Sequence, residues 1–454
     1  MNPLGGIMVK RKKWWHDIAP PRAEDPVLLL YLPWNLVHHG DVVPERRQWL
    51  LEHFNEVLDM FERSEIPVHM SYQQIDIDAL EIVCGFNPER LQNLPLLSAP
   101  FSHVLCGLIG DEYNDHVDWQ IENGLQGNVV GPEGEMGYFF PEWDIPADPS
   151  LYFRQDPKAF LLSVGAFATL YSECAVGDRV DGSVMQYDAI GVGAQTVVPM
   201  KGVNAFHKTW FAYQLDDSEG NLAAVIQSVR DIVENGGNAG KVVTLFVDGE
   251  SVLVGGARSF WNQPLKGYEI WERFFVALKA AGLDRYFHGM ERAYPRWNAA
   301  AANTRLPAGK AIGRHYGKWA SWKSQEKVKR RFEQVLPKRG AGYSAHFLGG
   351  LDAVSDRLSV MNAMELDRKG ALRTFTDKDN VTFSLDFDAT IPLVGHRATE
   401  TLSGKGAFTT QMRKLRERAR GLLEKEGKTF GPAEAFVLTL IEKLYAKYES
   451  YDVR

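Results

Sequence analysis

Two short segments of this sequence place a carboxylate where it could take part in catalysis. In residues 137–143, GYFFPEW, aromatic side chains surround Glu142. In residues 246–250, FVDGE, an apolar strand delivers Asp248 at its end, and the following glycine permits close approach of another group. Sugar rings have apolar faces that stack on aromatic rings and hydroxyls that carboxylates bind, so both segments suit carbohydrate chemistry. The plainer alternative is that Glu142 caps a turn and Asp248 caps the following helix.

The elements that must position these carboxylates alternate between strands and helices. The apolar run at 27–33 predicts a strand buried on both faces, and apolar residues at helical spacing predict an amphipathic helix over 46–63. A second strand is predicted between Ile66 and Tyr72. Strand, helix and strand in this order favour a parallel sheet.

The same alternation returns later in the chain. Residues 222–234 predict an amphipathic helix, 241–248 a buried strand, and 267–281 another helix that ends at Gly282. These repeated units predict an α/β fold, an incomplete or distorted TIM-like (β/α)7 barrel. In such barrels the chemistry lies at the carboxyl ends of the strands.

A chain of 454 residues is too long for one ordinary domain. We expect an N-terminal tail at 1–26, the catalytic barrel at 27–300 and a helical region at 301–370. A small C-terminal α+β extension at 371–454 would then hold a hairpin within 371–392 and two helices.

Composition and charge argue against several classes of protein. The net charge of −7 disfavours nucleic acid as a partner, since nucleic-acid-binding proteins usually carry a basic face. Three cysteines, Cys84, Cys106 and Cys174, cannot all pair and form no Cys-x-x-Cys motif, so a reduced, cytoplasmic compartment is expected. The sequence contains neither a secretory signal nor a long apolar stretch, so no membrane span is expected. The oligomeric state stays open.

Three weaker motifs are discounted. Residues 236–242, GGNAGKV, have the wrong spacing for a phosphate-binding loop and precede a strand instead of following one, so they predict a helix-to-strand turn. Residues 191–193, GVG, lack the third glycine of a dinucleotide fingerprint. His38 and His39 are adjacent and would point in different directions, which disfavours a metal site. Neither a cofactor nor a metal is therefore expected.

Taken together, the two carboxylate segments resemble glycoside hydrolase family 57. Residues 137–142 are similar to that family's nucleophile segment, in which a Gly and an aromatic precede Pro-Glu or Thr-Glu. Residues 247–250, VDGE, are similar to its acid/base segment, a strand ending in Asp-Gly-Glu or Asp-Ala-Glu. The order of the two along the chain is also the family's.

Further patches extend the resemblance over roughly residues 27–360. Residues 98–105, SAPFSHVL, are similar to the family's second motif, and the pairs Asp111-Glu112 and Gln120-Ile121 follow as they do there. Residues 305–319 and 346–351 are similar to later segments. The family's first motif, His-Gln-Pro, reads Tyr31-Leu32-Pro33 here. Residues 251–254, SVLV, stand where the family often has Lys-Phe-Gly or a Trp. Both departures would alter the substrate pocket.

The resemblance implies a retaining enzyme acting on α-glucans, with an oligo- or polysaccharide as substrate. Glu142 would be the nucleophile and Asp248 the acid/base, with their carboxyl groups about 5–5.5 Å apart. The activity would be amylase-like hydrolysis or 4-α-glucanotransferase-like transfer, and the mechanism needs no metal. The residues expected to contact the substrate are His103, Trp143, Glu250, Tyr31 and His346.

Other interpretations remain open. His103 could be a satisfied histidine at a strand end, and Trp143 could belong to the core. The missing His-Gln-Pro motif is compatible with a catalytically decayed barrel that binds glycan or serves as a structural protein. A polysaccharide deacetylase is a further alternative, but it would need a metal site of one Asp and two His. The sequence contains no His-x-x-x-His spacing near a strand-end Asp, which counts against it.

Overall fold

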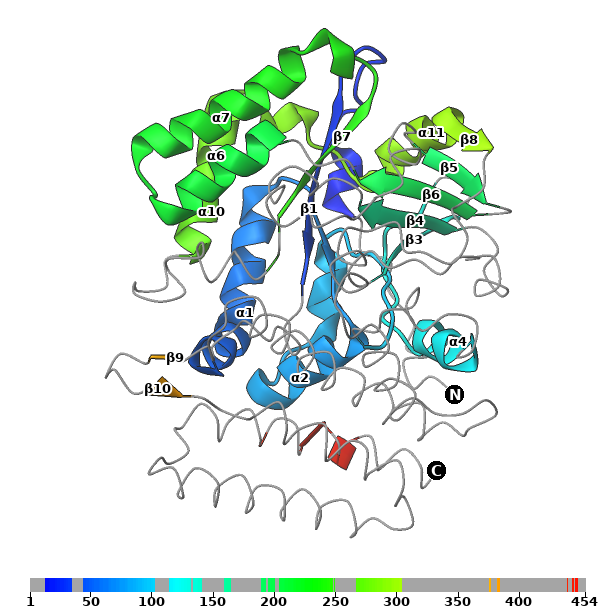
Figure 1. Ribbon diagram of the computed structural model, residues 1–454, viewed down its shortest axis with the longest axis vertical. Coiled ribbons are helices and arrows are strands. Elements are labelled where there is room, and N and C mark those ends of the chain that lie inside the picture. Colours follow the sequence, from blue (N-terminus) through cyan, green and yellow to red (C-terminus); the bar gives the residue numbers. More distant parts are fainter. Residues whose placement is uncertain are drawn as a thin grey trace, which may run out of the picture.

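The computed structural model describes residues 13–34, 44–102, 114–131, 134–140, 159–164, 189–192, 195–200, 204–247, 249 and 267–303, with 375–376, 382–383, 439, 443–444 and 446–447 (Figure 1). The elements that these residues form are, in chain order, η1 Trp14–Asp17, β1 Val27–Pro33, α1 Pro44–Ser64, β2 Val68–Ser71, α2 Gln74–Cys84, η2 Pro88–Asn93, α4 Asn114–Glu122, β3 Met136–Phe139, β4 Ala159–Val164, β5 Ala189–Val192, β6 Gln195–Met200, α6 Asn204–Leu215, α7 Glu219–Glu234, η7 Gly236–Asn238, β7 Val242–Phe246, α10 Gly267–Ala280, η8 Asp284–Tyr286, α11 Met290–Ala300, β8 Ala301–Asn303, β9 Phe375–Thr376 and β10 Thr382–Phe383.

Strand β1 lies at the centre of a parallel three-stranded sheet of order β2-β1-β7. All seven of its residues are buried. Leu28, Leu30 and Leu32 pack towards the helices, whereas the alternate residues pack into a second core on the other face. Burial on both faces explains why the sequence of this strand is apolar without interruption.

A short extended segment at 96–99 joins this sheet to the next one. On one side, the Leu97 amide donates to the Met70 carbonyl at 2.8 Å. On the other side, the Ser98 amide donates to the Gly137 carbonyl at 2.9 Å, and the Phe139 amide donates to the Ser98 carbonyl at 2.8 Å. Strands β2 and β3 therefore flank the same segment, and β1, β2 and β3 run in one direction.

The second sheet has the order β3-β4-β6-β5-β8. Its neighbours are parallel except that β5 runs antiparallel to β6. Only residues 193 and 194 separate these two strands, and so short a connection can join only antiparallel neighbours. This reversal departs from the uniformly parallel strands of a TIM barrel. Strand β8 carries the sheet three residues past the expected boundary at 300.

The inner faces of the strands meet in one apolar cluster, here called the inner core. Helix α11 contributes four residues to this cluster, and strands of both sheets contribute others. Its members are Val27, Leu29, Tyr31, Leu97, Ala99, Val129, Phe139, Ala189, Val198, Phe246, Met290, Ala293, Tyr294 and Trp297. Residues from both sheets therefore pack into one apolar cluster.

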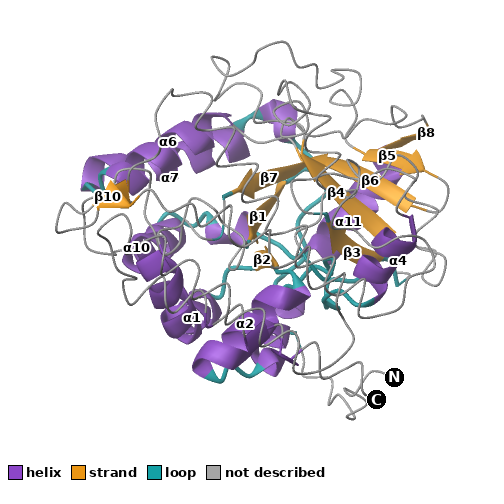
Figure 2. Cartoon of the chain, turned by 60° about the horizontal axis from the view of Figure 1, so that its bottom comes forward, coloured by secondary structure: helices purple, strands orange, loops and turns teal. Residues whose placement is uncertain are grey.

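The outer faces of β1, β2 and β7 pack against helices α1, α2, α6, α7 and α10, which lie along one side of these strands (Figure 2). Helix α7 illustrates how the local sequence specifies one of these helices. Ser218 caps its first turn by accepting from the Asn221 amide, and its buried residues Leu222, Val225 and Val229 recur at helical spacing.

Two parts of the C-terminal extension are described. Strands β9 and β10 form an antiparallel pair, as the predicted hairpin requires. Near the end of the chain, Leu444 is buried in the cluster beneath α1 and α2, and the Lys447 ammonium lies 2.8 Å from carboxylate oxygens of both Asp78 and Glu81 on α2. The end of the chain therefore docks on the N-terminal βα units. The apolar stripe predicted at Phe436, Leu440 and Tyr445 lies outside the described residues.

The main local predictions agree with the structure to within a few residues. The predicted strands at 27–33 and 241–248 correspond to β1 and β7, and the predicted helices at 46–63, 222–234 and 267–281 correspond to α1, α7 and α10. Residues 236–240 form the predicted helix-to-strand turn. In the part of the chain that is described, no helix has the length and apolar character needed to cross a membrane.

Candidate active site

Most of the predicted site residues lie just beyond described strand ends. Glu142 and Trp143 follow β3, Asp248 and Glu250 follow β7, and His103 follows the segment at 101–102. These five residues and His346 are outside the described residues. Tyr31 is the predicted site residue that the structure does describe, on β1 between β2 and β7.

The backbone on both sides of Asp248 is hydrogen-bonded to β1. The Val247 amide donates to the Tyr31 carbonyl at 3.1 Å, and the Gly249 amide donates to the Pro33 carbonyl at 2.7 Å. The β1–β7 ladder thus continues past the last residue of β7 and includes both neighbours of Asp248.

Gly249 also packs directly on an aromatic side chain. A Cβ atom at this position would lie 2.5 Å from Cδ2 of Trp34, far inside van der Waals contact. The Trp34 indole is 1% exposed and stacks on Tyr72 with ring centroids 5.6 Å apart. The glycine that follows Asp248 is therefore required by packing, in addition to any role it has towards a substrate.

The two strands that lead to the carboxylates end on one layer of aromatic rings, here called the aromatic floor: Tyr31, Phe139 and Phe246. The Tyr31 ring centroid lies 5.9 Å from that of Phe139 and 6.1 Å from that of Phe246. Phe139 is three residues before Glu142, and Phe246 is two residues before Asp248. Strands β3 and β7 run in the same direction.

Tyr31 is a fully buried member of this floor. Its hydroxyl lies 2.6 Å from the Ser71 hydroxyl on β2. Burial raises the pKa of Tyr31 well above its usual value, although the hydrogen bond with Ser71 acts in the opposite direction. The phenol is therefore neutral at physiological pH. Its contact with a substrate stays a prediction.

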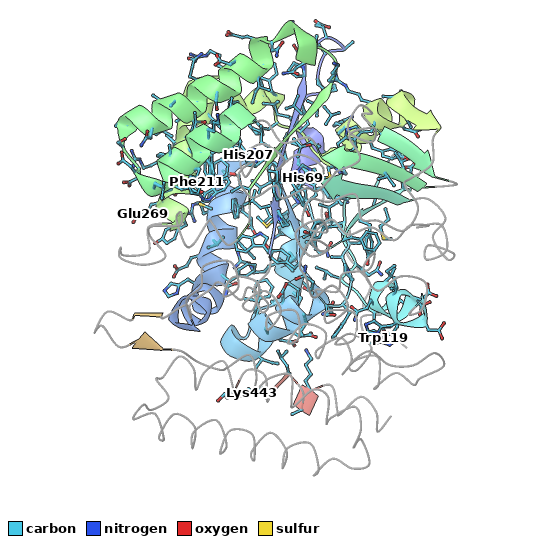
Figure 3. All side chains as sticks on the ribbon, in the orientation of Figure 1. His69, Trp119, His207, Phe211, Glu269 and Lys443 are labelled. Carbon is cyan, nitrogen blue, oxygen red and sulfur yellow. The ribbon has the colours of Figure 1, made fainter. Side chains whose placement is uncertain are left out.

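Two histidines that sequence reasoning did not single out lie close to β1 and β7 (Figure 3). His69 donates from Nδ1 to the Leu30 carbonyl at 3.0 Å and accepts at Nε2 from the Met290 amide at 2.9 Å. Both ring nitrogens are thus satisfied in the neutral form. Burial lowers the pKa of His69 to about 4, although the bond to Leu30 raises it slightly. His69 is therefore a neutral structural link between β1, β2 and α11.

His207 connects α6 to the end of β7. Its Nε2 donates to the Phe246 carbonyl at 2.7 Å, and its ring contacts the Phe246 ring edge-on. The bond fixes α6 beside the residue that lies two positions before Asp248. No local signal singles out this histidine, because its partner is 39 residues away.

The segment that leads to His103 is held by Gln120 on α4. The Ser102 amide and hydroxyl both donate to Gln120 Oε1, at 2.8 and 3.0 Å. The other end of this amide, Nε2, lies 3.3 Å from Nε2 of His116. Gln120, which the family resemblance includes, therefore orients the chain immediately before His103.

No protein family model matches this sequence, and no curated protein matches it significantly. A solved structure of a glycoside hydrolase family 57 branching enzyme from the hyperthermophilic archaeon Thermococcus kodakaraensis is similar over 93% of this chain and 94% of its own, with 11% identity and a TM-score of 0.50. The two chains share a fold.

Two weaker likenesses accompany it. A 4-α-glucanotransferase from Thermococcus litoralis is similar over 86% of this chain and 60% of its own, with 13% identity and a TM-score of 0.43. A polysaccharide deacetylase from Mycobacterium smegmatis is similar over 64% of this chain and 97% of its own, with 12% identity and a TM-score of 0.38. At these scores neither likeness bears on function. The likeness to the branching enzyme supports a family 57-like fold for this chain.

Proposed function

We propose that this protein is a retaining, α-glucan-active enzyme that uses Glu142 as nucleophile and Asp248 as acid/base. The observation that carries the proposal is the aromatic floor. Strands β3 and β7 are far apart in sequence, yet both end on Tyr31, and each continues into one of the two carboxylate segments. The shared fold with a family 57 branching enzyme supports the α-glucan-active class of the proposal.

The proposed first step forms a glycosyl-enzyme. A carboxylate oxygen of Glu142 attacks the anomeric carbon, and the bond from that carbon to the leaving oxygen breaks. Asp248 donates its proton to the leaving oxygen, so the leaving sugar departs as an alcohol and Asp248 becomes a carboxylate.

The second step releases the sugar with its anomeric configuration retained. Asp248 removes a proton from the incoming hydroxyl, whose oxygen attacks the anomeric carbon and displaces Glu142. With water as acceptor the enzyme is a hydrolase. With a sugar hydroxyl as acceptor it is a transglycosylase of amylase-like or 4-α-glucanotransferase-like type.

The proposed mechanism requires Asp248 to be protonated before the first step. The adjoining residue Val247 is buried, and the inward-facing Phe246 and Tyr31 supply apolar surface. In general, apolar surroundings and a nearby anionic nucleophile both favour the protonated form of a carboxyl group.

The proposal is tested with Glu142→Gln and Asp248→Asn beside wild type, and with Glu234→Gln as a control on the exposed end of α7. Products from an α-glucan are followed by NMR to assign their anomeric form. We expect the α-anomer as first product from wild type and from the control, and no turnover by Glu142→Gln. Asp248→Asn should react with a glycosyl fluoride, whose leaving group departs without protonation, and should accumulate a glycosyl-enzyme visible by mass spectrometry.

External azide should restore turnover in Asp248→Asn, because azide attacks without losing a proton. An inverted first product, or full activity of Glu142→Gln, would refute the mechanism. A wild-type protein that binds α-glucans without turning them over would point instead to a decayed barrel. Metal-dependent release of acetate from acetylated glycans would point to the deacetylase alternative.

A further inference from the structure

Gln73 stands at a junction next to the candidate site, directly after β2 and directly before α2. Its backbone is fixed: its amide donates to Asp76 Oδ2 at 3.2 Å, and its carbonyl accepts from the Asp76 amide at 3.0 Å. The residue is extended, with ψ of 153°, so it continues the alternation of β2. Ser71, two residues earlier, faces the inner side and bonds with Tyr31, and Gln73 therefore lies on that same inner face.

The side chain of Gln73 is fully buried, yet its carboxamide has no hydrogen-bond partner. It is 0% exposed, and neither Oε1 nor Nε2 makes a hydrogen bond with a described protein group. The side chain faces the Asp76 amide in the arrangement of a capping box, but it makes no capping hydrogen bond there. Buried polar groups in native proteins are almost always paired, because leaving one unpaired costs free energy. Exchanging the assigned positions of Oε1 and Nε2 would not give either atom a partner, since both positions are unpaired.

Other glutamines in the described part of the chain behave differently. Gln120 is equally buried, and both ends of its amide are engaged, with Ser102 and with His116. Gln74, the next residue along the chain, donates from Nε2 to Asp78 at 3.2 Å. Gln214 is also buried, and of its two amide atoms Nε2 is the one that is fully buried without a partner. Gln73 alone among these four keeps an unused donor and an unused acceptor.

The neighbours of Gln73 in the fold are segments that border the candidate site. On one side, the Trp34 amide, just past β1, donates to the Ser71 carbonyl at 2.9 Å. On the other side, the Ile75 amide donates to the Phe101 carbonyl at 3.0 Å, two residues before His103. Residue 73 thus lies at the carboxyl end of β2, between the carboxyl end of β1 and the chain that leads to His103.

We propose that Gln73 is a substrate-binding residue of this site, which takes a sugar residue of the α-glucan. Oε1 accepts from one sugar hydroxyl, and Nε2 donates to a neighbouring sugar oxygen, as a carboxamide with one acceptor and two donors can do on adjacent hydroxyls. The sugar reaches the amide by displacing the atoms that cover it. This inference rests on the proposed function and names a further contact for the same substrate.

The test compares Gln73→Met with the matched control Gln74→Met. Methionine is close to glutamine in length and shape and lacks its polar atoms. Because the Gln73 amide has no protein partner, Gln73→Met should leave the urea midpoint unchanged or raise it. It should lower kcat/KM for maltooligosaccharides about 10- to 100-fold. The reason is that the buried sugar hydroxyl loses its hydrogen-bond partner when the amide is removed. Gln74→Met loses a bond to Asp78, so it should lower the midpoint slightly and leave kcat/KM unchanged.

Binding is measured as well as turnover, by calorimetry with maltoheptaose in the Glu142→Gln background. The inference holds if Gln73→Met weakens binding or turnover while stability is kept. It is overturned if Gln73→Met lowers the urea midpoint as a structural residue would, or if binding and kcat/KM stay at wild-type values. A wild-type chain that neither binds nor converts any α-glucan refutes the proposed function itself, and this inference with it.

Discussion

Replacement of Gly249 by alanine is the perturbation for which the structure gives the clearest expectation. The added Cβ would lie 2.5 Å from Cδ2 and 2.6 Å from Cγ and Cε2 of Trp34. Normal carbon contacts are about 3.5 Å or longer, so one group must move by about 1 Å. The indole cannot easily yield, because it is 1% exposed and held between Tyr72 and Phe54, each with its ring centroid 5.6 Å away.

The strand end after β7 must therefore move, and Asp248 is the adjoining residue. Overpacking of this kind costs about 1–3 kcal/mol of unfolding free energy. A displacement of about 1 Å in a catalytic group can lower turnover about 100-fold. We expect Gly249→Ala to show both effects, with the fall in kcat larger than any change in KM.

The assays are urea unfolding and steady-state kinetics on an α-glucan. Gly220→Ala serves as a control, since a Cβ at Gly220 meets no atom within 4 Å and the position lies in the exposed first turn of α7. This control should be neutral or slightly stabilising. Trp34→Leu removes the colliding ring at the cost of a cavity, and in the double variant that cavity accommodates the new methyl group.

The double variant Trp34→Leu/Gly249→Ala should lose less unfolding free energy than the two single variants lose together. The difference should be about 1 kcal/mol or more. If the two losses of unfolding free energy simply add, the Trp34 indole is not the group that requires a glycine at position 249. A Gly249→Ala protein with wild-type stability and wild-type kcat would refute the packing argument more directly.

Two further predictions concern charge. His69 has a folded-state pKa of about 4 against about 6.5 when unfolded, so its contribution to stability is fully present above pH 6.5 and is lost as the pH falls towards 4, at about 1.4 kcal/mol per pH unit. Urea unfolding between pH 4.5 and 7 should show this slope, reduced in His69→Gln, and an equal slope in both proteins would contradict it. The Lys447→Met change removes the cation beside Asp78, whose side chain is 9% exposed, and should loosen the end of the chain by about 1–2 kcal/mol. Hydrogen exchange at 443–447 should then quicken, whereas Lys443→Met, which changes an exposed lysine four residues earlier, should leave it unchanged.

Much of the local structure could be read from the sequence because its signals are local. The uninterrupted apolar run at 27–33 indicated a strand buried on both faces, and α7 and α10 were indicated by apolar residues at helical spacing. The family resemblance predicted a fold that the likeness to the branching enzyme supports. The reversal at β5 was not predicted, because residues 189–200 were not recognised as two strands joined by a two-residue connection.

In the candidate site, too, some features could be predicted from the sequence and others could not. The carboxylates Glu142 and Asp248 were selected from their neighbours in the sequence, and their roles stay predictions. The aromatic floor beneath their segments, the bond from His207 to Phe246 and the packing of Gly249 on Trp34 each join residues more than 30 positions apart.

By itself, then, the sequence determined which segments form strands and helices and which residue types stand at their ends, since hydrophobic periodicity and capping act over a few residues. Only the tertiary structure decided that β3 and β7 end on the same ring of Tyr31, and that the Gln73 amide is buried without a partner. Strand register and burial depend on the packing of distant segments against each other, and no short stretch of sequence contains that information.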